Sequence, residues 1–181
     1  ISFCQTSELD GGNVLKGIEN YLETQSISLE SGSISKSVLK YYGKDYTFSV
    51  PILSMLTICS ILGEDDIKMI PQLPFELTLL PSSLYRFFNM QVVSYAIPAL
   101  VAVGIYLHKR KNRSNFLVRF VRNKSINPAI KKLSSLVPES GGFLEAIPLT
   151  AFVSMCLIKS DQGNNMIVEK GILFLYQQQR D

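Results

Sequence analysis

The most apolar stretch of the chain is AIPALVAVGIYL, residues 96–107, and the basic sequence HKRK follows it at once. It closes an uncharged run, residues 87–107, that is long enough to be considered as a membrane-spanning helix. Polar side chains interrupt the first third of that run and Pro98 lies near its centre, so only residues 96–107 are strongly apolar. A stretch of this length is typical of a buried core helix or an interfacial segment. We therefore expect a core helix or a monotopic segment rather than a span.

The composition fits a folded chain without a cysteine framework. The 181 residues are 46% apolar and 18% charged, with a net charge of +3. This suits one domain, or a large piece of one, and is too apolar for disorder. Such a small net charge does not indicate a nucleic-acid partner. Cys4, Cys59 and Cys156 are too few and too widely spaced for disulfides or zinc, so we predict buried apolar thiols.

Apolar residues recur at spacings of three and four along most of the chain, which indicates amphipathic helices. The expected helices cover residues 14–25, 33–42, 50–62, 149–158 and 168–178. We expect helix 50–62 to be buried on all faces, with Pro51 in its first turn and Gly63 at its end. Three prolines in residues 70–81 allow only a short helical turn. No segment alternates with period two for long enough to be a strand, so the sequence predicts an all-α fold with a proline-rich connector at 70–81.

Positive charge is concentrated in one part of the chain. Nine of the eighteen basic residues lie in residues 109–132, and no Asp or Glu occurs from Leu77 to Pro138. We expect two basic amphipathic pieces here, 116–121 and 130–136, separated by Asn127-Pro128. One interpretation is a solvated face. The other is a surface that contacts anionic lipid head groups, with Phe116, Leu117, Phe120 and Val121 among the charges. No nucleic-acid-binding module is recognisable, so no such partner is expected.

Few residues carry the patterns of catalytic chemistry. The only histidine, His108, lies in a basic cluster, and we expect it at the surface. Adjacent residues on a helix face apart, so Asp65-Asp66 is expected to be a polar helix end. No phosphate-binding loop, zinc spacing or Ser-His-Asp set is present, and we predict neither a metal nor a cofactor. Glu145 differs, because its carboxylate lies in an apolar context before a helix, where it could cap N–H groups or face a cavity.

Two segments with similar spacing give the first sign of a family. Lys16-Gly17 is followed by Tyr21-Leu22 and Gln25, and Lys170-Gly171 by Phe174-Leu175 and then Gln178 or Gln179. This order resembles the glutamine–tryptophan repeat of triterpene cyclases, in which glycine and tryptophan follow the glutamine. The first copy lacks them and the second reaches Asp181 before them. We therefore expect this sequence to be a fragment of a longer chain.

Two longer stretches carry the same resemblance. The sequence IPQLPFELTLLP, residues 70–81, resembles the segment of squalene–hopene cyclases in which a proline-bounded connector leads into a Glu-Leu-x-Leu-Leu-Pro turn. The sequence GGFLEAIPLTAF, residues 141–152, is similar to the later Gly-Gly loop and proline-started helix of their bacterial relatives. Together with the repeat copies, the resemblance covers most of residues 14–180 in the order of the N-terminal part of the family.

The resemblance implies a fold and an activity. Such cyclases have two α/α barrels and bind squalene or a similar linear polyprene in an apolar cavity between them. They are isomerases of triterpenoid biosynthesis that protonate the substrate and so start a cascade of carbocation cyclisations. They are monotopic proteins that take substrate from the membrane, here expected on its cytoplasmic side. The resemblance implies that residues 1–181 form one partial domain, an incomplete α/α toroid, whose partners are the polyprene, the lipid surface and the second barrel.

The resemblance also limits the expected site. The aspartate-rich proton-donor motif of the family has no match in this segment, so no catalytic residue is expected here and the fragment alone should be inactive. Ile67 stands where family members often carry a tryptophan ahead of the connector. The resemblance implies that the substrate pocket or channel is lined by Ile67, Ile70, Leu73, Phe143, Glu145, Ile147 and Pro148. Simple packing is the alternative for each of these residues. The alternative function is a non-enzymatic helical repeat or membrane-anchored module.

Overall fold

A computed structural model of the chain describes four continuous ranges and five separate residues near the N-terminus. These are residues 33–43, 45–80, 97–111 and 115–179, with Lys16, Gly17, Asn20, Tyr21 and Thr24. Regular structure in these ranges is helical throughout, so the all-α prediction is confirmed for the described part of the chain. The predicted helix 14–25, with the first repeat copy, and Cys4 lie largely or wholly outside the described residues.

The chain divides into two units, residues 1–71 and 72–181, with the boundary inside the proline-rich connector. In the first unit, α3 (Ser33–Tyr42) and α4 (Tyr46–Ile58) form a helical pair. Helix α3 ends at Gly43, whose φ of 57° suits glycine, so the predicted helix 33–42 and its stop are confirmed. The single barrel domain expected from the sequence stays a prediction.

Helix α4 begins and ends four residues earlier than the predicted helix 50–62. It begins at Tyr46, four residues before the predicted start, and Pro51 therefore lies inside the helix rather than in its first turn. The side-chain hydroxyl of Ser49 donates to the carbonyl of Asp45 at 3.0 Å, which helps to close a first turn ahead of the proline. Within the predicted range, every residue of 50–58 is buried or half-buried, so the predicted burial is confirmed in part. Tyr46 and Phe48, in the added first turn, are 46% and 57% exposed.

Helix α5 (Glu64–Met69) begins directly after Gly63, which is its N-cap residue. The prediction that Gly63 ends the previous helix is wrong, because α4 already ends at Ile58. Asp65 is exposed and pairs with Lys68, as expected for a polar helix end. The same expectation is wrong for Asp66, which is fully buried. Its carboxylate accepts hydrogen bonds from the Gly63 amide and from the Ser35 hydroxyl on α3. A carboxylate in the first helical turn satisfies a free N–H group, which makes this burial tolerable.

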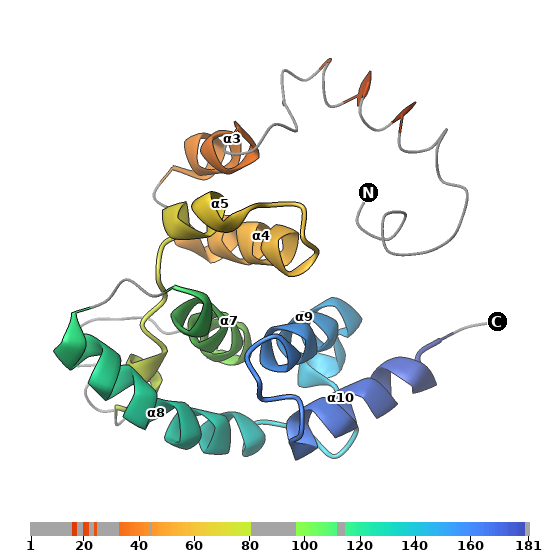
Figure 1. The fold of residues 1–181 in the computed structure, drawn as a ribbon. Helices are drawn as coiled ribbons and strands as arrows, with labels where there is room; N and C mark the ends of the chain where they lie inside the picture. The colour runs from red at the N-terminus through yellow and green to blue at the C-terminus, as the bar shows by residue number, and fades with distance from the viewer. Residues whose placement is uncertain are drawn as a thin grey trace. The chain divides into compact units, whose positions relative to one another are not determined.

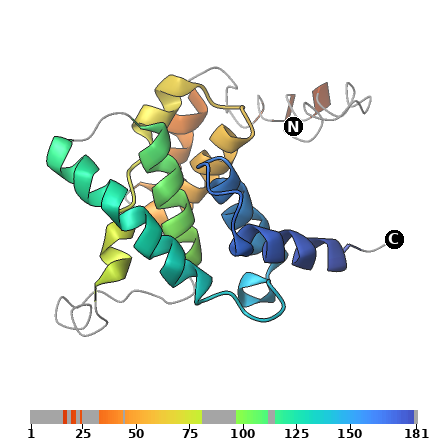
Figure 2. The ribbon, with the colours of Figure 1, turned by 60° about the horizontal axis from the view of Figure 1, so that its bottom comes forward.

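The second unit is arranged around helix α7, which packs against α8 and the connector on one side and α9 on the other, while α10 packs on α9 (Figures 1 and 2). Its described elements are η1 (Phe75–Leu79), α7 (Ile97–Arg110), α8 (Phe116–Ser134), η3 (Phe143–Glu145), α9 (Ile147–Ile158) and α10 (Met166–Gln177). The short 3-10 turn η1 confirms that residues 70–81 hold only a brief helical segment.

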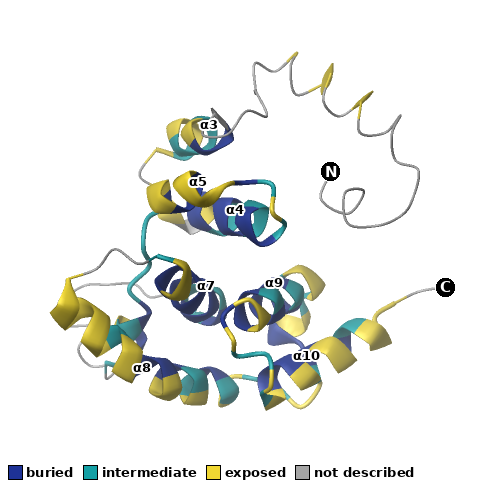
Figure 3. Cartoon of the chain, in the orientation of Figure 1, coloured by how far each residue is buried: buried dark blue, intermediate teal, exposed yellow. Residues whose placement is uncertain are grey.

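Helix α7 is the core of the second unit. Every residue from Val101 to His108 is buried, which appears in Figure 3 as a continuous dark helix. The prediction that residues 96–107 form a core helix is confirmed for the described residues 97–107. Within the described ranges, no helix has the combination of length and hydropathy that crossing a membrane requires.

Helix α8 overturns a second prediction. The two basic pieces expected on either side of Asn127-Pro128 form one continuous helix of 19 residues. Pro128 lacks the N–H group that would bond to the carbonyl of Lys124, but the helix passes through it. Packing supplies the reason: Ser125, Ile126, Ala129 and Leu133 flank the proline and are buried, so the inner face holds both halves on one axis.

Helices α9 and α10 agree with the predicted 149–158 and 168–178 to within two residues at each end. Pro148 lies in the first turn of α9, where a missing N–H group is harmless. The side chain of Asn165 caps α10 by accepting from the amides of Ile167 and Val168. Cys156 on α9 is buried, and burial raises the pKa of its thiol to about 12, so the predicted apolar thiol is confirmed there.

Candidate functional site

The first two turns of α8, residues 116–121, are exposed on every face, and we call them the exposed end of α8. Five of these six side chains are large and apolar. Phe116 and Leu117 are 81% and 75% exposed, and Phe120 is 56% exposed. Figure 3 shows this end as a mostly yellow segment beside the buried α7. So much contiguous exposed apolar surface on one helix marks an interaction site.

Basic side chains surround this apolar surface. Arg119 lies within the exposed end of α8, and Lys124 follows one turn later with its ammonium 5.9 Å from the centroid of the Phe120 ring. Lys109 and Arg110 are exposed at the C-terminal end of α7. Because the sequence has no acidic residue from Leu77 to Pro138, these charges act together as a local positive field.

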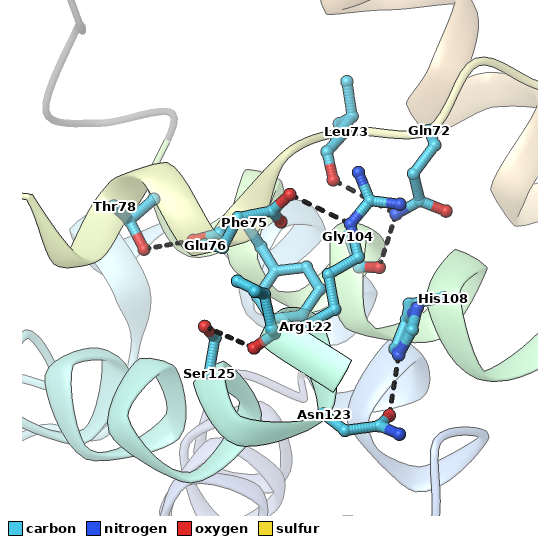
Figure 4. A network of polar contacts seen from close by, with 11 residues as sticks. Gln72, Leu73, Phe75, Glu76, Thr78, Gly104, His108, Arg122, Asn123 and Ser125 are labelled. Atoms are coloured by element: carbon cyan, nitrogen blue, oxygen red, sulfur yellow. Dashed lines mark hydrogen bonds and ion pairs between the residues drawn. The ribbon is translucent and has the colours of Figure 1, made fainter. Parts of the chain in front are cut away.

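The next turn of α8 is fastened to the connector. The Nε of Arg122 donates to Glu76 Oε1 at 2.9 Å, and the two side chains are only 15% and 19% exposed. Lys132, three turns further along α8, donates to the backbone carbonyl of Thr78. Figure 4 shows Arg122 reaching across to the connector at Glu76. Two basic residues of α8 thus hold the 3-10 turn η1 against the helix.

The connector is also fastened to α7. The side-chain amide of Gln72 donates to the carbonyl of Gly104 at 2.9 Å and to that of Leu73 at 3.1 Å (Figure 4). The glycine at position 104 lets the connector lie close to α7, because a Cβ at that position would lie only 2.8 Å from the Cβ of Phe75. The irregular segment that carries the connector motif is therefore a fixed part of the core.

His108 is not at the surface, and the prediction for it is wrong. Its side chain is 7% exposed, its ring centroid lies 6.0 Å from that of Phe75, and its Nε2 lies 2.8 Å from Asn123 Oδ1 on α8. Its position in a basic sequence cluster hid this, because α7 turns the neighbouring Lys109 and Arg110 outward while His108 faces the core. Among the described residues, His108 Nδ1 is buried without a hydrogen-bond partner.

Lys111, one residue beyond α7, is half-buried near the same junction. Burial and, to a smaller extent, the positive charge of Arg122 lower the pKa of its ammonium from 10.5 to about 8. Both causes disfavour a charged amine. The junction between α7 and α8 is therefore a place where additional positive charge is unfavourable.

The Gly-Gly loop is shaped by close packing on α10. A Cβ on Gly141 would lie 2.4 Å from the Lys170 carbonyl oxygen, and one on Gly142 would lie 2.4 Å from the Phe174 ring. The loop then places Leu144 and Glu145 at φ values of 54° and 53°, which are unusual for residues other than glycine. Both side chains are exposed. The loop is thus held in a strained conformation in front of α9.

The seven side chains expected to line a substrate pocket are distributed over both units. Ile67 and Ile70 belong to the first unit and are buried, and Leu73 is half-buried on the connector. The other four lie in or after the Gly-Gly loop, and of these Phe143 is buried while the remaining three, Glu145, Ile147 and Pro148, are exposed.

Glu145 keeps its carboxylate in solvent, where Oε1 accepts a hydrogen bond from the Ser140 hydroxyl at 2.6 Å. Within the second unit the loop presents Glu145 and Ile147 to the outside of the fold. The role of Glu145 in substrate binding stays a prediction, as do the roles of the other six residues.

In the described part of the chain, no three or more His, Cys, Asp or Glu side chains are grouped closely enough to hold a metal ion.

Sequence reasoning missed the ion pair between Glu76 and Arg122. A signal was present, because Glu76 is the last acidic residue before the long acid-free stretch and carries the only charge of the connector motif. Such an isolated carboxylate next to a basic segment is a candidate for pairing.

Comparison with protein-family models, with curated proteins and with solved structures found no match to this chain.

Proposed function

We propose that this chain is part of a squalene-cyclase-like terpene cyclase, an isomerase that cyclises a linear polyprene at the surface of a membrane. The proton donor lies outside this segment, and the segment contributes part of an α/α barrel. The proposal rests on the resemblance of residues 70–81 and 141–152 to squalene–hopene cyclases. It is supported by the tight packing of both stretches, since Glu76 fastens the connector to α8 and Gly141 allows the loop to contact α10.

The membrane part of the proposal is carried by the exposed end of α8. Its apolar side chains would enter the boundary between head groups and acyl chains, and Arg119 and Lys124 would meet anionic head groups. Each basic residue near an anionic leaflet contributes about 1 kcal/mol of attraction. Burying a phenylalanine or leucine contributes about 1.5–3 kcal/mol more. Charge complementarity therefore favours an anionic lipid surface over a neutral protein groove as the partner.

The test of this surface is vesicle binding by a charge-inserting variant. Phe116→Glu combined with Leu117→Glu should lower the affinity for vesicles containing anionic lipid at least about tenfold, through lost burial and added repulsion. Cosedimentation with phosphatidylserine-containing vesicles measures it. The matched control is Leu173→Glu with Tyr176→Glu on α10, which changes two side chains of similar exposure by the same charge. If both double variants bound the vesicles as tightly as the wild type, the exposed end of α8 would not be the lipid contact.

The test of the cyclase activity uses the product of the complete reading frame. Incubated with squalene in detergent micelles, it should yield cyclic products of unchanged mass, which gas chromatography with mass spectrometry detects. Denatured protein serves as the control. Squalene recovered unchanged, together with retained vesicle binding, would contradict the cyclase assignment but leave the membrane surface intact.

The second candidate function is a non-enzymatic helical module that binds a membrane surface. One observation favours it: the exposed end of α8 and its anchorage to the connector are complete within the described residues and require no catalytic group. The two candidates share the lipid contact and differ in polyprene turnover, so the squalene experiment separates them.

A further inference from the structure

The loop between α8 and α9 carries an acidic surface. Glu139 and Glu145 are its two charged residues, and both are exposed. The Ser140 hydroxyl donates to Oε1 of Glu145 at 2.6 Å, and Ser140 follows Glu139 directly, so the two carboxylates belong to one part of the loop. No basic residue occurs in the sequence from 133 to 158. Lys170 of α10 lies beside this loop, whose net charge stays negative when that lysine is included.

The same loop exposes three large apolar side chains. Leu136, Leu144 and Ile147 are 42%, 63% and 46% exposed. Leu144 has a φ of 54° and a ψ of 25°, a left-handed conformation that suits glycine, asparagine or aspartate and strains a leucine. Neither this backbone conformation nor packing within the chain accounts for a leucine here. An exposed leucine that is held under strain indicates contact with a partner. We call residues 136–147 the acidic loop.

The acidic loop is the counterpart of the exposed end of α8. Each surface combines large exposed apolar side chains with two exposed charges, and these are Glu139 and Glu145 in the loop and Arg119 and Lys124 on α8. The charges of the two surfaces have opposite signs, and complementary charges favour association and fix its register. The acidic loop thus offers what an anionic lipid surface offers, with carboxylates in place of phosphates and leucine side chains in place of acyl chains.

The two surfaces of one copy cannot meet. Helix α8 is continuous over 19 residues and is therefore about 28 Å long. Its exposed end is at the N-terminus, whereas the acidic loop begins beyond its C-terminus, so the two surfaces lie at opposite ends of the helix (Figure 2). The buried inner face of α8 keeps the helix on the core between them. A contact between the two surfaces consequently requires a second copy of the chain.

We propose that, in the absence of lipid, copies of this chain associate head to tail, with the exposed end of α8 of one copy on the acidic loop of the next. This goes beyond the proposed function, because it gives the exposed end of α8 a second occupant. Lipid and a second copy use the same surface and therefore compete for it. Each associated pair keeps one unoccupied surface of each kind, so further copies add to it as the concentration rises.

The experiment is sedimentation velocity of the lipid-free chain at low ionic strength over a range of concentrations. The weight-average sedimentation coefficient of the wild type should rise with concentration. Glu139→Lys combined with Glu145→Lys places like charges opposite each other and should weaken the association at least about tenfold. Arg119→Glu combined with Lys124→Glu should weaken it by a similar factor.

Mixing the two charge-reversed variants gives the sharpest readout. Each alone repels its own copies, but in the mixture every basic surface meets an acidic one, so the concentration-dependent rise should return. Glu64→Lys with Glu169→Lys is the matched control, because it reverses two exposed carboxylates outside the acidic loop and should associate as the wild type does. Helical circular dichroism verifies that each variant is folded.

A further variant separates association from folding. Leu144→Asn suits the left-handed backbone, so the chain should fold at least as stably, while the lost burial of a leucine should weaken association at least about tenfold. A wild-type sedimentation coefficient that stays constant with concentration, or a mixture of charge-reversed variants that stays monomeric, would overturn the head-to-tail contact. So would association of either charge-reversed variant as tight as that of the wild type. No lipid is present, so vesicle binding can fail or succeed independently.

Discussion

Replacing Gly141 with alanine should lower the free energy of unfolding by about 4 kcal/mol. Gly141 has a φ of 86°, and a Cβ there would lie 2.4 Å from the carbonyl oxygen and 2.8 Å from the carbonyl carbon of Lys170. An L-residue in this region of φ costs about 1–2 kcal/mol, and forcing extra volume into a packed site costs about 1–3 kcal/mol more. Backbone atoms of α10 cannot swing aside as a side-chain end can. The loop and α10 would separate.

Urea unfolding followed by helical circular dichroism measures this loss. Gly163→Ala is the matched control, because the nearest atom to its Cβ would be 3.7 Å away, an ordinary contact, and the change should stay within about 0.5 kcal/mol of wild type. If both alanine variants unfolded at the same urea concentration, the close contact between the Gly-Gly loop and α10 would be wrong. The proline-started helix would then owe its position to another contact.

The described helices follow from the sequence where local signals and packing agree. The spacing of apolar residues in 33–42, followed by Gly43, predicts α3. The prediction succeeds because α3 has a partner, α4, for its apolar face. Three prolines prevent a long helix in 70–81 wherever that segment lies. Residues 97–107 form a core helix since polar residues and Pro98 leave them too short to span a lipid core. In these segments the physical cause acts over a few residues and is visible in the sequence.

Other features depend on contacts that no short window contains. Pro128 normally interrupts a helix, but the buried face on both sides of it holds α8 together. His108 and Asp66 look like surface residues among their charged neighbours, but both are buried, and each has a hydrogen-bond partner on another helix, Asn123 for His108 and Ser35 for Asp66. Charge counts located the basic region correctly. They did not show which basic side chain forms an ion pair, as Arg122 does with Glu76, and which are exposed at the surface, as Arg119 is.

Arg122→Met should destabilise the second unit by about 3 kcal/mol, because it leaves the largely buried carboxylate of Glu76 without its partner. Methionine keeps most of the apolar stem of the arginine, so the loss reports the charge and its hydrogen bond rather than packing. Glu76 Oε2 already has no hydrogen-bond partner among the described residues. In the variant, Oε1 would lose its hydrogen bond to Arg122 as well. Chemical unfolding at pH 7 measures the change.

A double-mutant cycle separates the ion pair from the cost of each substitution. Glu76→Gln removes the charge but keeps an acceptor near Arg122, and the double variant with Arg122→Met should lose less than the sum of the single losses, by about 2 kcal/mol. The pair is mostly buried, so raising the salt concentration should change this coupling little. Additive losses would mean that Glu76 and Arg122 act independently. The connector would then be fastened to α8 mainly by Lys132 and the carbonyl of Thr78, and the exposed end of α8 would keep its position without the ion pair.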